Sequence, residues 1–472
     1  MPDATHAHPL VFAPRRPADR LARLGDWMAA HRRAILAAQW VVVVFYALLV
    51  VLPAFLPIPS AQARLFSGDA WHERLVLLAQ YLFWGLWWPF VILSTMFMGR
   101  VWCGFLCPEG MLAEFASRHG RGGAIPRWMR WSGWPVAAFI LTTVYGQLVS
   151  VYEYPQAALL ILGGSTVAAV AVGYLYGKGK RVWCRYLCPV SGIFALLARL
   201  APVHFGIDRE AWNRYPVRTH AVDCGPLLNV KKLGGMAQCH ACGRCSGHRD
   251  AVALAVRSPN AEILNGLNGE RPRASEAILL IFGALGVALG AFQWTVSPWF
   301  VALKQAAAEW LIDRDILWPL EEGSAWWLLT NHPEAGDVFT WLDGAAILAW
   351  ILGIAAVVGG LTLGAVRLSA RLAGLDWRRL AMGLVPLAGV SLFLGLSMMT
   401  ATHLRAEGVA LSWLPGLRAA LLAAGAAWSV QLGFRLLKVS PGGTAPKIAA
   451  GLSWLLPPCM IAASWWLVFF VW

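Results

Sequence analysis

Long apolar runs separated by short polar segments follow one another along most of the chain. Nine of these runs reach the length of about 20 residues that a helix needs to cross a bilayer. They cover roughly residues 34–56, 75–98, 132–152, 155–176, 275–295, 341–366, 379–402, 415–436 and 449–472. The pattern therefore predicts an all-α polytopic membrane protein with about nine transmembrane helices.

The composition indicates the same class of protein. Of the 472 residues, 58% are hydrophobic and only 14% are charged, whereas soluble domains carry about 25% charged residues. The polar first 33 residues lack the apolar centre and the cleavage site of a secretory signal. We therefore expect the first membrane helix to act as its own uncleaved insertion signal.

The spacing of the apolar runs divides the chain into four segments. We predict a basic cytoplasmic tail at 1–33, a four-helix membrane block at 34–199, a polar cytoplasmic insert at 200–273 and a five-helix membrane block at 274–472. The five-helix block contains a loop at about 296–340 that is rich in tryptophan and in acidic residues. This loop is expected on the outer face.

The formal net charge of +14 is explained by membrane topology. If the N-terminus lies in the cytoplasm and nine helices alternate, 33 of the 39 Lys and Arg residues face the cytoplasm. Basic residues gather on that side under the positive-inside rule. We therefore predict a multi-pass protein of the bacterial cytoplasmic (inner) membrane with its C-terminal Trp472 outside, and we exclude nucleic-acid binding.

Two of the apolar runs end in nearly the same nine residues, R-V-W-C-x-x-L-C-P. The copies begin at Arg100 and Arg181 and supply four cysteines, Cys103, Cys107, Cys184 and Cys188. The predicted topology brings both copies to the cytoplasmic face, where disulfides are rare. C-x3-C-P ends the cysteine run of bacterial ferredoxins, so each copy could supply half of a four-thiolate site. A second cluster, another metal, redox-active thiols and simple packing of small side chains all remain open.

The insert carries a second cysteine motif, C-x2-C-x2-C, formed by Cys239, Cys242 and Cys245, with Cys224 fifteen residues upstream. Three cysteines at steps of three let one tight loop hold three corners of a [4Fe–4S] cluster. Cys224 is the other cysteine of the insert and the candidate fourth ligand. A zinc site that uses these cysteines with His240 or His248 is the competing interpretation. The motif makes the insert ferredoxin-like.

Together the two motifs resemble the NapH, NosR C-terminal and CcoG group of membrane 4Fe–4S proteins. The resemblance covers about residues 75–260 and rests on the twin C-x3-C-P motifs and the Cys239–Cys245 run. It implies electron transfer through [4Fe–4S] clusters, one and up to two here. The sequence departs from the group in having one cysteine-rich ferredoxin motif instead of two, and in its five additional C-terminal helices.

The resemblance also implies partners. NapH-like members are viewed as quinol dehydrogenases, so the quinone pool is an expected substrate, with a respiratory reductase, an oxidase or a soluble electron carrier as the redox partner. CcoG-like members reduce copper during assembly of a respiratory oxidase, which gives an alternative function. A zinc-stabilised membrane scaffold is a second alternative. Whether the protein is an enzyme of the quinol dehydrogenase type stays open at this point.

Overall fold

The computed structural model describes residues 20–60, 63–66, 70–266, 272–441 and 443–472. The first nineteen residues of the predicted basic tail lie outside the described residues. The chain forms two compact units, each assembled from three separate stretches. Unit 1 comprises residues up to 44, 93–131 and 168–273, and unit 2 comprises residues 45–92, 132–167 and 274–472.

The predicted all-α polytopic fold is confirmed. Within the described residues, eight helical stretches are long and apolar enough to cross a membrane: Arg32–Phe55, Trp71–Met98, Pro155–Tyr176, Ala274–Gln293, Trp341–Ala373, Trp377–Ala406, Leu414–Lys438 and Thr444–Val471. The remaining predicted run, 132–152, is helix α6 (Trp134–Leu148), which has only 15 residues. At 1.5 Å per residue this helix is about 22 Å long, shorter than the bilayer's hydrocarbon core of about 30 Å.

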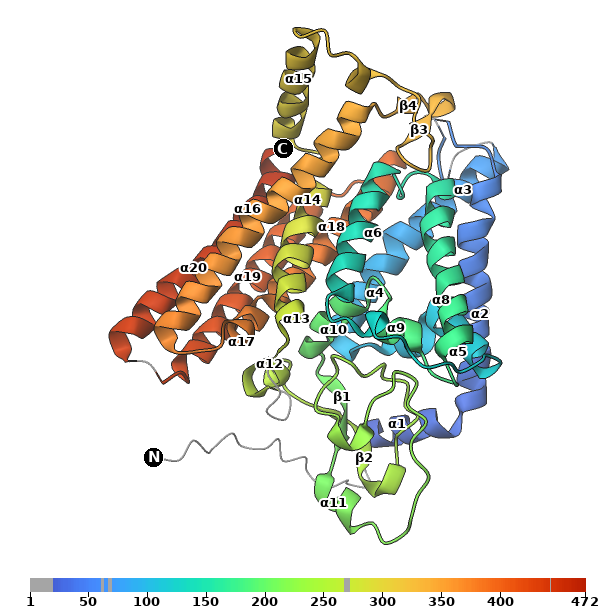
Figure 1. Ribbon diagram of the computed structural model, residues 1–472, viewed down its shortest axis with the longest axis vertical. Coiled ribbons are helices and arrows are strands. Elements are labelled where there is room, and N and C mark those ends of the chain that lie inside the picture. The colour runs from blue at the N-terminus through green and yellow to red at the C-terminus, as the bar shows by residue number, and fades with distance from the viewer. Residues whose placement is uncertain (1–19, 61–62, 67–69, 267–271, 442) are drawn as a thin grey trace. The chain divides into compact units, whose positions relative to one another are not determined.

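Unit 2 is built almost entirely of helices (Figure 1). In addition to α6, they are α3 (Trp71–Gln80), α7 (Pro155–Ala158), α13 (Ala274–Ile278), α14 (Ala288–Gln293), α15 (Pro298–Ile312), α16 (Trp341–Ala373), α17 (Trp377–Ala381), α18 (Val385–Ala406), α19 (Leu414–Lys438) and α20 (Thr444–Trp466). Two short strands, β3 (Asn331–His332) and β4 (Asp337–Val338), pair antiparallel. Helix α20 packs against both α16 and α19.

Small residues let these helices approach one another closely. The Trp454 side chain of α20 is fully buried, and a Cβ at Gly433 of α19 would lie only 1.9 Å from its ring. Inside a bilayer the hydrophobic effect does not drive helices together, because lipid tails are as apolar as the side chains. Membrane helices therefore gain packing contacts by approaching closely at small residues such as glycine.

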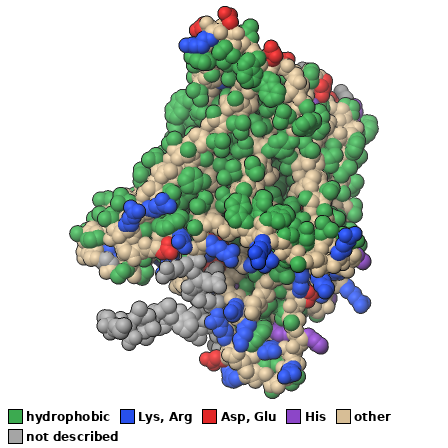
Figure 2. Space-filling model, in the orientation of Figure 1, with side chains coloured by type: hydrophobic (Ala, Val, Ile, Leu, Met, Phe, Trp, Pro, Cys, Tyr) green, Lys and Arg blue, Asp and Glu red, His purple; other side chains and the backbone are tan. Residues whose placement is uncertain are grey.

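The outward faces of these helices are apolar. Leu352, Val357 and Leu361 of α16 are exposed, as are Ile448 and Leu452 of α20. Figure 2 shows hydrophobic side chains covering the visible faces of α16 and α20. Exposed aliphatic surface along whole helices is suited to lipid rather than to water, in agreement with a membrane-spanning unit.

Unit 1 combines helix ends with short elements. Its elements are α1 (Arg20–Ala30), the first part of α2 (Arg32–Val51), the end of α4 (Trp88–Met98), the π-helical turn η3 (Trp102–Leu106), α5 (Pro108–Arg118), the end of α8 (Gly164–Tyr176), α9 (Val182–Tyr186), α10 (Ser191–Leu197), α11 (Arg209–Arg214) and α12 (Ala261–Asn265). Strands β1 (Val203–Ile207) and β2 (Val252–Val256) pair antiparallel, with Phe205 opposite Leu254.

Helix α1 packs against β2 and is a finding of the structure, since the polar sequence of residues 20–30 did not lead us to predict a helix. A Cβ at Gly25 would lie 3.1 Å from the Cβ of Leu254, so the helix lies directly on the strand. Met28, Phe205, Val252 and Leu254 share one buried cluster. The antiparallel pair β1–β2 and α1 thereby form a small core that includes Cys239 and Ala241 of the cysteine-rich loop.

Candidate metal centres

The two C-x3-C-P copies fold into similar turns. Cys103 lies in the π-helical turn η3, and Cys107 follows it with extended backbone and begins α5. The Cys107 sulfur accepts a hydrogen bond from the backbone N–H of Gly110 at 3.4 Å. Cys184 lies in α9, and Cys188 follows in the turn before α10. In each copy one thiol sits in the last helical turn and the next sits just beyond it, because proline disfavours helical backbone in the preceding residue.

The fold brings the thiols of the two copies together. A Cβ at Gly110 would lie 3.4 Å from the Cys184 sulfur and 3.5 Å from the Cys107 sulfur, so these two sulfurs are at most about 7 Å apart. Cys103 and Cys184 are both buried. All four thiols interact electrostatically: Cys103 and Cys184 each raise the pKa of Cys107 and of Cys188.

Burial is the main cause of these shifts. It raises the pKa of Cys184 to about 12, although Arg181 opposes the rise. It also raises the pKa of Cys107 and Cys188 well above the ordinary thiol value. The thiolate is the reactive form of cysteine, and burial disfavours it at these three positions. Metal binding to such thiols has to displace their protons.

Two arginines of the repeat contact this group. Arg100 donates to the Cys103 sulfur at 3.6 Å and to the Ser191 hydroxyl at 2.8 Å. Arg181 donates to the backbone oxygen of Cys103. Arg185, the third basic residue of the repeat, instead donates to Gln238 at 2.6 Å. Buried cations beside four thiols offset the negative charge that the thiolates would carry as ligands.

The four cysteines of the insert line one cavity. Cys224, Cys239, Cys242 and Cys245 line one partly open pocket together with apolar neighbours that include Phe205 and Leu228. Ala241 and Gly243 both adopt positive φ, of 49° and 74°, which turns the loop tightly enough for three cysteines to face the same space. The Cys239 sulfur also accepts a hydrogen bond from the Ala241 N–H at 3.4 Å.

Burial raises pKa values among the insert cysteines, as it does among the C-x3-C-P cysteines. Burial raises the pKa of Cys239 to about 12, and Cys242 and Cys224 add to the rise. Burial, followed by Cys239, Cys242 and Cys224, raises the pKa of Cys245 further above the ordinary value. Cys224, fifteen residues upstream, therefore belongs to the same cluster of thiols as the C-x2-C-x2-C motif.

The four cysteines line one pocket without being gathered tightly around a single point. Four sulfurs at about 2.3 Å from one zinc ion lie less than about 4 Å apart. Among the residues that the structure describes, no three His, Cys, Asp or Glu side chains are grouped tightly enough to hold a metal ion.

The histidines of the zinc interpretation differ in position. His240 is buried and lines the cysteine cavity, and its pKa lies well below the ordinary value because of burial and four nearby arginines. His248 instead packs its ring on Trp212, with 5.1 Å between the ring centroids. Cys459, the remaining cysteine, is exposed on α20 and belongs to neither group.

The two cysteine groups adjoin each other within unit 1. Gly104, next to Cys103, packs so closely on the insert that an added Cβ would lie 2.1 Å from the backbone oxygen of His240. The same Cβ would lie 3.2 Å from the Cα of Cys242. Arg181 interacts electrostatically with both Cys184 and Cys242. Sequence alone placed these motifs on one side of the membrane, but not in contact.

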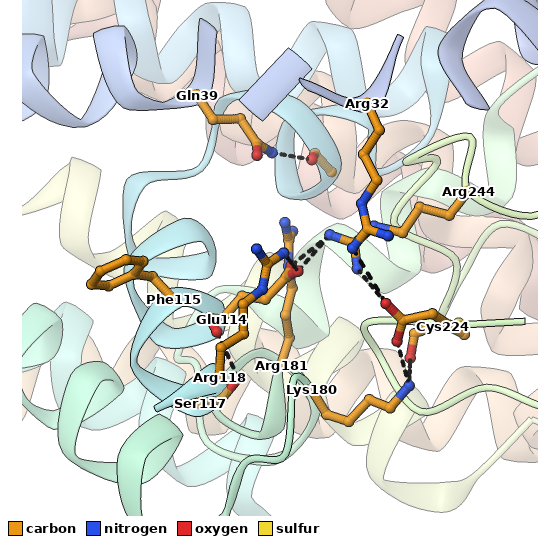
Figure 3. A network of polar contacts seen from close by, with 12 residues as sticks. Arg32, Gln39, Glu114, Phe115, Ser117, Arg118, Lys180, Arg181, Cys224 and Arg244 are labelled. Atoms are coloured by element: carbon orange, nitrogen blue, oxygen red, sulfur yellow. Dashed lines mark hydrogen bonds and ion pairs between the residues drawn. The ribbon is translucent and has the colours of Figure 1, made fainter. Parts of the chain in front are cut away.

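A buried carboxylate joins the two groups, and the sequence analysis missed it. Glu114 of α5 forms ion pairs with Arg118 at 2.7 Å, Arg181 at 2.8 Å and Arg244 at 2.6 Å (Figure 3). Arg181 precedes the second C-x3-C-P copy, and Arg244 lies between Cys242 and Cys245. Glu114 follows Cys107 by seven residues, two helical turns on the same face, and that spacing was the available signal.

The same network reaches the residue before Cys224. Asp223 forms ion pairs with Lys180 at 2.8 Å, Arg32 at 3.3 Å and Arg244 at 3.8 Å. Arg244 therefore bridges Glu114 and Asp223. The C-x2-C-x2-C loop, the Cys224 segment and α5 are held together by charge as well as by packing.

The fold and the two cysteine groups define a multi-pass membrane protein with a 4Fe-4S binding domain. The family of 4Fe-4S binding domains matches residues 81–126 and 159–208. These stretches contain both C-x3-C-P copies and end before Cys224. The match therefore supports an iron–sulfur cluster in this protein, and the assignment of individual cysteines as its ligands stays a prediction.

Relatives of known name agree with this class. The chain is 29% identical over 202 residues to "Regulatory protein NosR" of Pseudomonas aeruginosa, covering 38% of this chain and 27% of NosR. It is 24% identical over 181 residues to "Putative electron transport protein YccM" of Escherichia coli, covering 33% of this chain and 50% of YccM. The predicted resemblance to the NosR-containing group is confirmed.

A third relative is "Protein NirI" of Paracoccus denitrificans, 31% identical over 157 residues, which cover 29% of this chain and 22% of NirI. The chain thus spans half or less of the length of each of these relatives. No solved structure matches the chain.

Proposed function

We propose that this protein is a membrane-bound electron carrier with two [4Fe–4S] clusters. Cys224, Cys239, Cys242 and Cys245 would hold one cluster, and Cys103, Cys107, Cys184 and Cys188 would hold the other. A bound [4Fe–4S] cluster supplies reversible one-electron chemistry, with a potential set by charge, hydrogen bonds and exposure. The observation that carries the proposal is the close contact between the segments that hold the two groups of cysteines, at Gly104 beside Cys103 and at the backbone of Cys242.

The chain's own residues would tune and insulate both sites. Arg100 donates to a cysteine sulfur, and Arg181 interacts with a cysteine of each group. Positive charge near a cluster stabilises its more reduced, more negative state. The apolar lining of the insert cavity keeps water away from its sulfurs, which lowers the local dielectric constant and strengthens the effect of those charges.

The quinone pool is the partner we propose within the bilayer, because a polytopic protein with cluster ligands at its helix ends has access to membrane-dissolved carriers. The names of the relatives support electron transport in general and leave the partner open. We place both cysteine groups on the cytoplasmic side because of the distribution of Lys and Arg. Copper reduction during oxidase assembly remains the alternative implied by the resemblance.

Iron counting tests the proposal. Protein purified anaerobically should contain about eight irons and matching sulfide, as two [4Fe–4S] clusters require. Cys103→Ser combined with Cys184→Ser should lower this to about four, and so should Cys239→Ser combined with Cys242→Ser. Cys459→Ser, outside both groups, is the matched control and should keep about eight.

Two results would contradict the proposal. Stoichiometric zinc without iron would establish the scaffold alternative. Unchanged iron content in the Cys103/Cys184 double variant would show that these cysteines do not hold a second cluster. The quinone part is tested on the same preparation by anaerobic addition of a quinol, which should produce the electron paramagnetic resonance signal of a reduced cluster. Full iron content without that signal leaves the carrier role intact and excludes the quinone partner.

A further inference from the structure

The strongest unassigned feature is a recess beside the cysteine-rich loop. It lies within unit 1, is partly open to solvent and has a cavity volume of about 130 Å³. One wall is a single face of α1 and α2, formed by Met28, Arg32, Ile35, Leu36 and Gln39. The remaining lining residues come from η3, α5 and the insert: Gly104, Arg118, Asp223, Cys242 and Arg244. The recess therefore reaches from the start of a membrane helix to the cysteine loop.

The charge of the recess favours an anion. Three arginines line it (Arg32, Arg118 and Arg244) against one lining carboxylate, Asp223. Glu114, behind this wall, forms ion pairs with Arg118, Arg244 and Arg181. Lys180 adds a further cation at Asp223. These five cations and two carboxylates leave an excess of positive charge around the recess.

One residue that lines the recess, Arg244, has a hydrogen-bond donor without an acceptor in the described part of the chain. Arg244 is only 13% exposed, and its Nη1 is buried without a hydrogen-bond partner among the described residues. An oxygen of Asp223 lies 3.8 Å from this nitrogen, too far for a hydrogen bond. A buried guanidinium N–H without a partner is costly, and an oxyanion in the recess would satisfy it.

The walls indicate an anion with an apolar part. Met28 of α1 and Ile35 and Leu36 of α2 present apolar side chains beside the arginines. Helix α2 belongs to the candidate membrane span that begins at Arg32. Arg32 is half exposed and Gln39 is buried, so the recess is open at Arg32 and closed at its floor. Arginine binds phosphate with paired hydrogen bonds.

We propose that this recess binds an organic phosphate, and that its source is the headgroup of an anionic phospholipid at the membrane surface. The phosphate would lie among Arg32, Arg118 and Arg244, and the glycerol and first acyl carbons would lie along Ile35 and Leu36. Bound there, the lipid would cover the backbone of Cys242 and exclude water from that side of the cysteine loop. The proposal does not depend on the identity of the cluster.

Lipid binding to the full-length holoprotein in detergent tests the proposal. Native mass spectrometry should show saturable binding of phosphatidylglycerol with a clear preference over phosphatidylcholine. Arg32→Gln and Arg118→Gln should each weaken it about tenfold, as expected for the loss of a charge-assisted hydrogen bond. The control is Arg33→Gln, since Arg33 is exposed on α2 and does not line the recess; its affinity should match the wild type.

Three other results would change or overturn the lipid-binding proposal. Competition by glycerol phosphate without any preference between the two lipids would support the phosphate site and assign it a soluble ligand. Equal weakening by Arg33→Gln and Arg32→Gln would overturn the proposal in favour of diffuse surface attraction. Absence of saturable binding to any of these probes, by protein with unchanged iron content, would also overturn it.

Discussion

At the scale of single residues, Glu114 is the most consequential side chain outside the cysteines. Burial by itself would raise its pKa, but Arg181, Arg244 and Arg118 lower the pKa from 4.5 to about 2. That shift corresponds to about 3 kcal/mol of interaction between the carboxylate and its partners. One buried carboxylate thereby links α5 to the segments that carry both cysteine groups.

Glu114→Gln should therefore destabilise the protein by about 3 kcal/mol, because three arginines lose their charged partner in a buried site. It should also raise the reduction potentials of the two proposed clusters, since a negative charge is removed near both groups of cysteines. Denaturation midpoints and redox titration followed by electron paramagnetic resonance measure the two effects.

Glu210→Gln is the matched control for this prediction. Glu210 also forms an ion pair, with Arg214 at 3.6 Å, but both side chains are largely exposed. Exposed pairs contribute at most about 1 kcal/mol, so this variant should behave as the wild type. Potentials that stay unchanged in Glu114→Gln would show that Glu114 acts on folding alone.

The buried His204 on β1 should make the stability of the folded protein depend on pH. Burial, followed by the nearby Arg257, lowers the pKa of His204 from 6.5 to about 4. Between these values the unfolded chain binds a proton that the folded protein does not. Stability should therefore fall as the pH decreases from about 6.5 to about 4, by up to about 1.4 kcal/mol per pH unit.

Unfolding midpoints at several pH values between 4 and 7 measure this dependence. His204→Gln should remove that component of the slope, whereas His31→Gln, at an exposed position, should keep it. A slope that is the same in His204→Gln and in the wild type would refute the assignment to His204.

At the scale of elements, the contact between η3 and the C-x2-C-x2-C loop decides the architecture of the site. It depends on the absence of a side chain at Gly104, where a Cβ would meet backbone atoms of both His240 and Cys242. Backbone atoms cannot move aside as a flexible side chain can. The contact thus depends on a glycine at this position.

Gly104→Ala should separate the two elements, lower the iron content and destabilise the protein by about 1–3 kcal/mol, the usual range for overpacking. Gly164→Ala provides the control, because a Cβ at Gly164 meets nothing within 4 Å and alanine favours a helix. Iron analysis and thermal unfolding distinguish the variants. Full iron content in Gly104→Ala would mean that the loop accommodates the methyl group.

At the scale of the whole molecule, the distribution of charge favours one orientation in the membrane. Within unit 2, seven basic residues lie around the end where α16 and α19 terminate and α17 and α20 begin: Arg367, Arg371, Arg378, Arg379, Arg435, Lys438 and Lys447. The positive-inside rule therefore predicts that this end faces the cytoplasm.

Alkaline phosphatase fusions test the predicted topology, since the enzyme is active only outside the cytoplasm. Fusions after Gly408 and after Trp472 should be active, and a fusion after Lys438 should be inactive. A fusion after Ser150 tests the short helix α6 and should be active if α6 crosses. Activity at both Lys438 and Trp472, or inactivity at Ser150, would contradict nine alternating crossings.

The sequence by itself determined the class of protein, the apolar spans and the cysteine motifs. These are local properties: about 20 apolar residues in a row cannot remain in water, and the spacing Cys239, Cys242, Cys245 is set within one loop. Eight predicted spans correspond to long helices for this reason. The 15-residue α6 shows the limit of that reasoning, because an apolar run does not fix where its helix begins and ends.

Only the tertiary structure decided which cysteines meet and what surrounds them. Cys107 and Cys184 are far apart in the sequence yet both adjoin Gly110, and Glu114 meets Arg181 and Arg244 from three separate stretches of chain. No periodicity records such pairings, since they depend on how helix ends and loops pack. The same packing creates the arginine-lined recess, which exists only where α2, α5 and the insert come together.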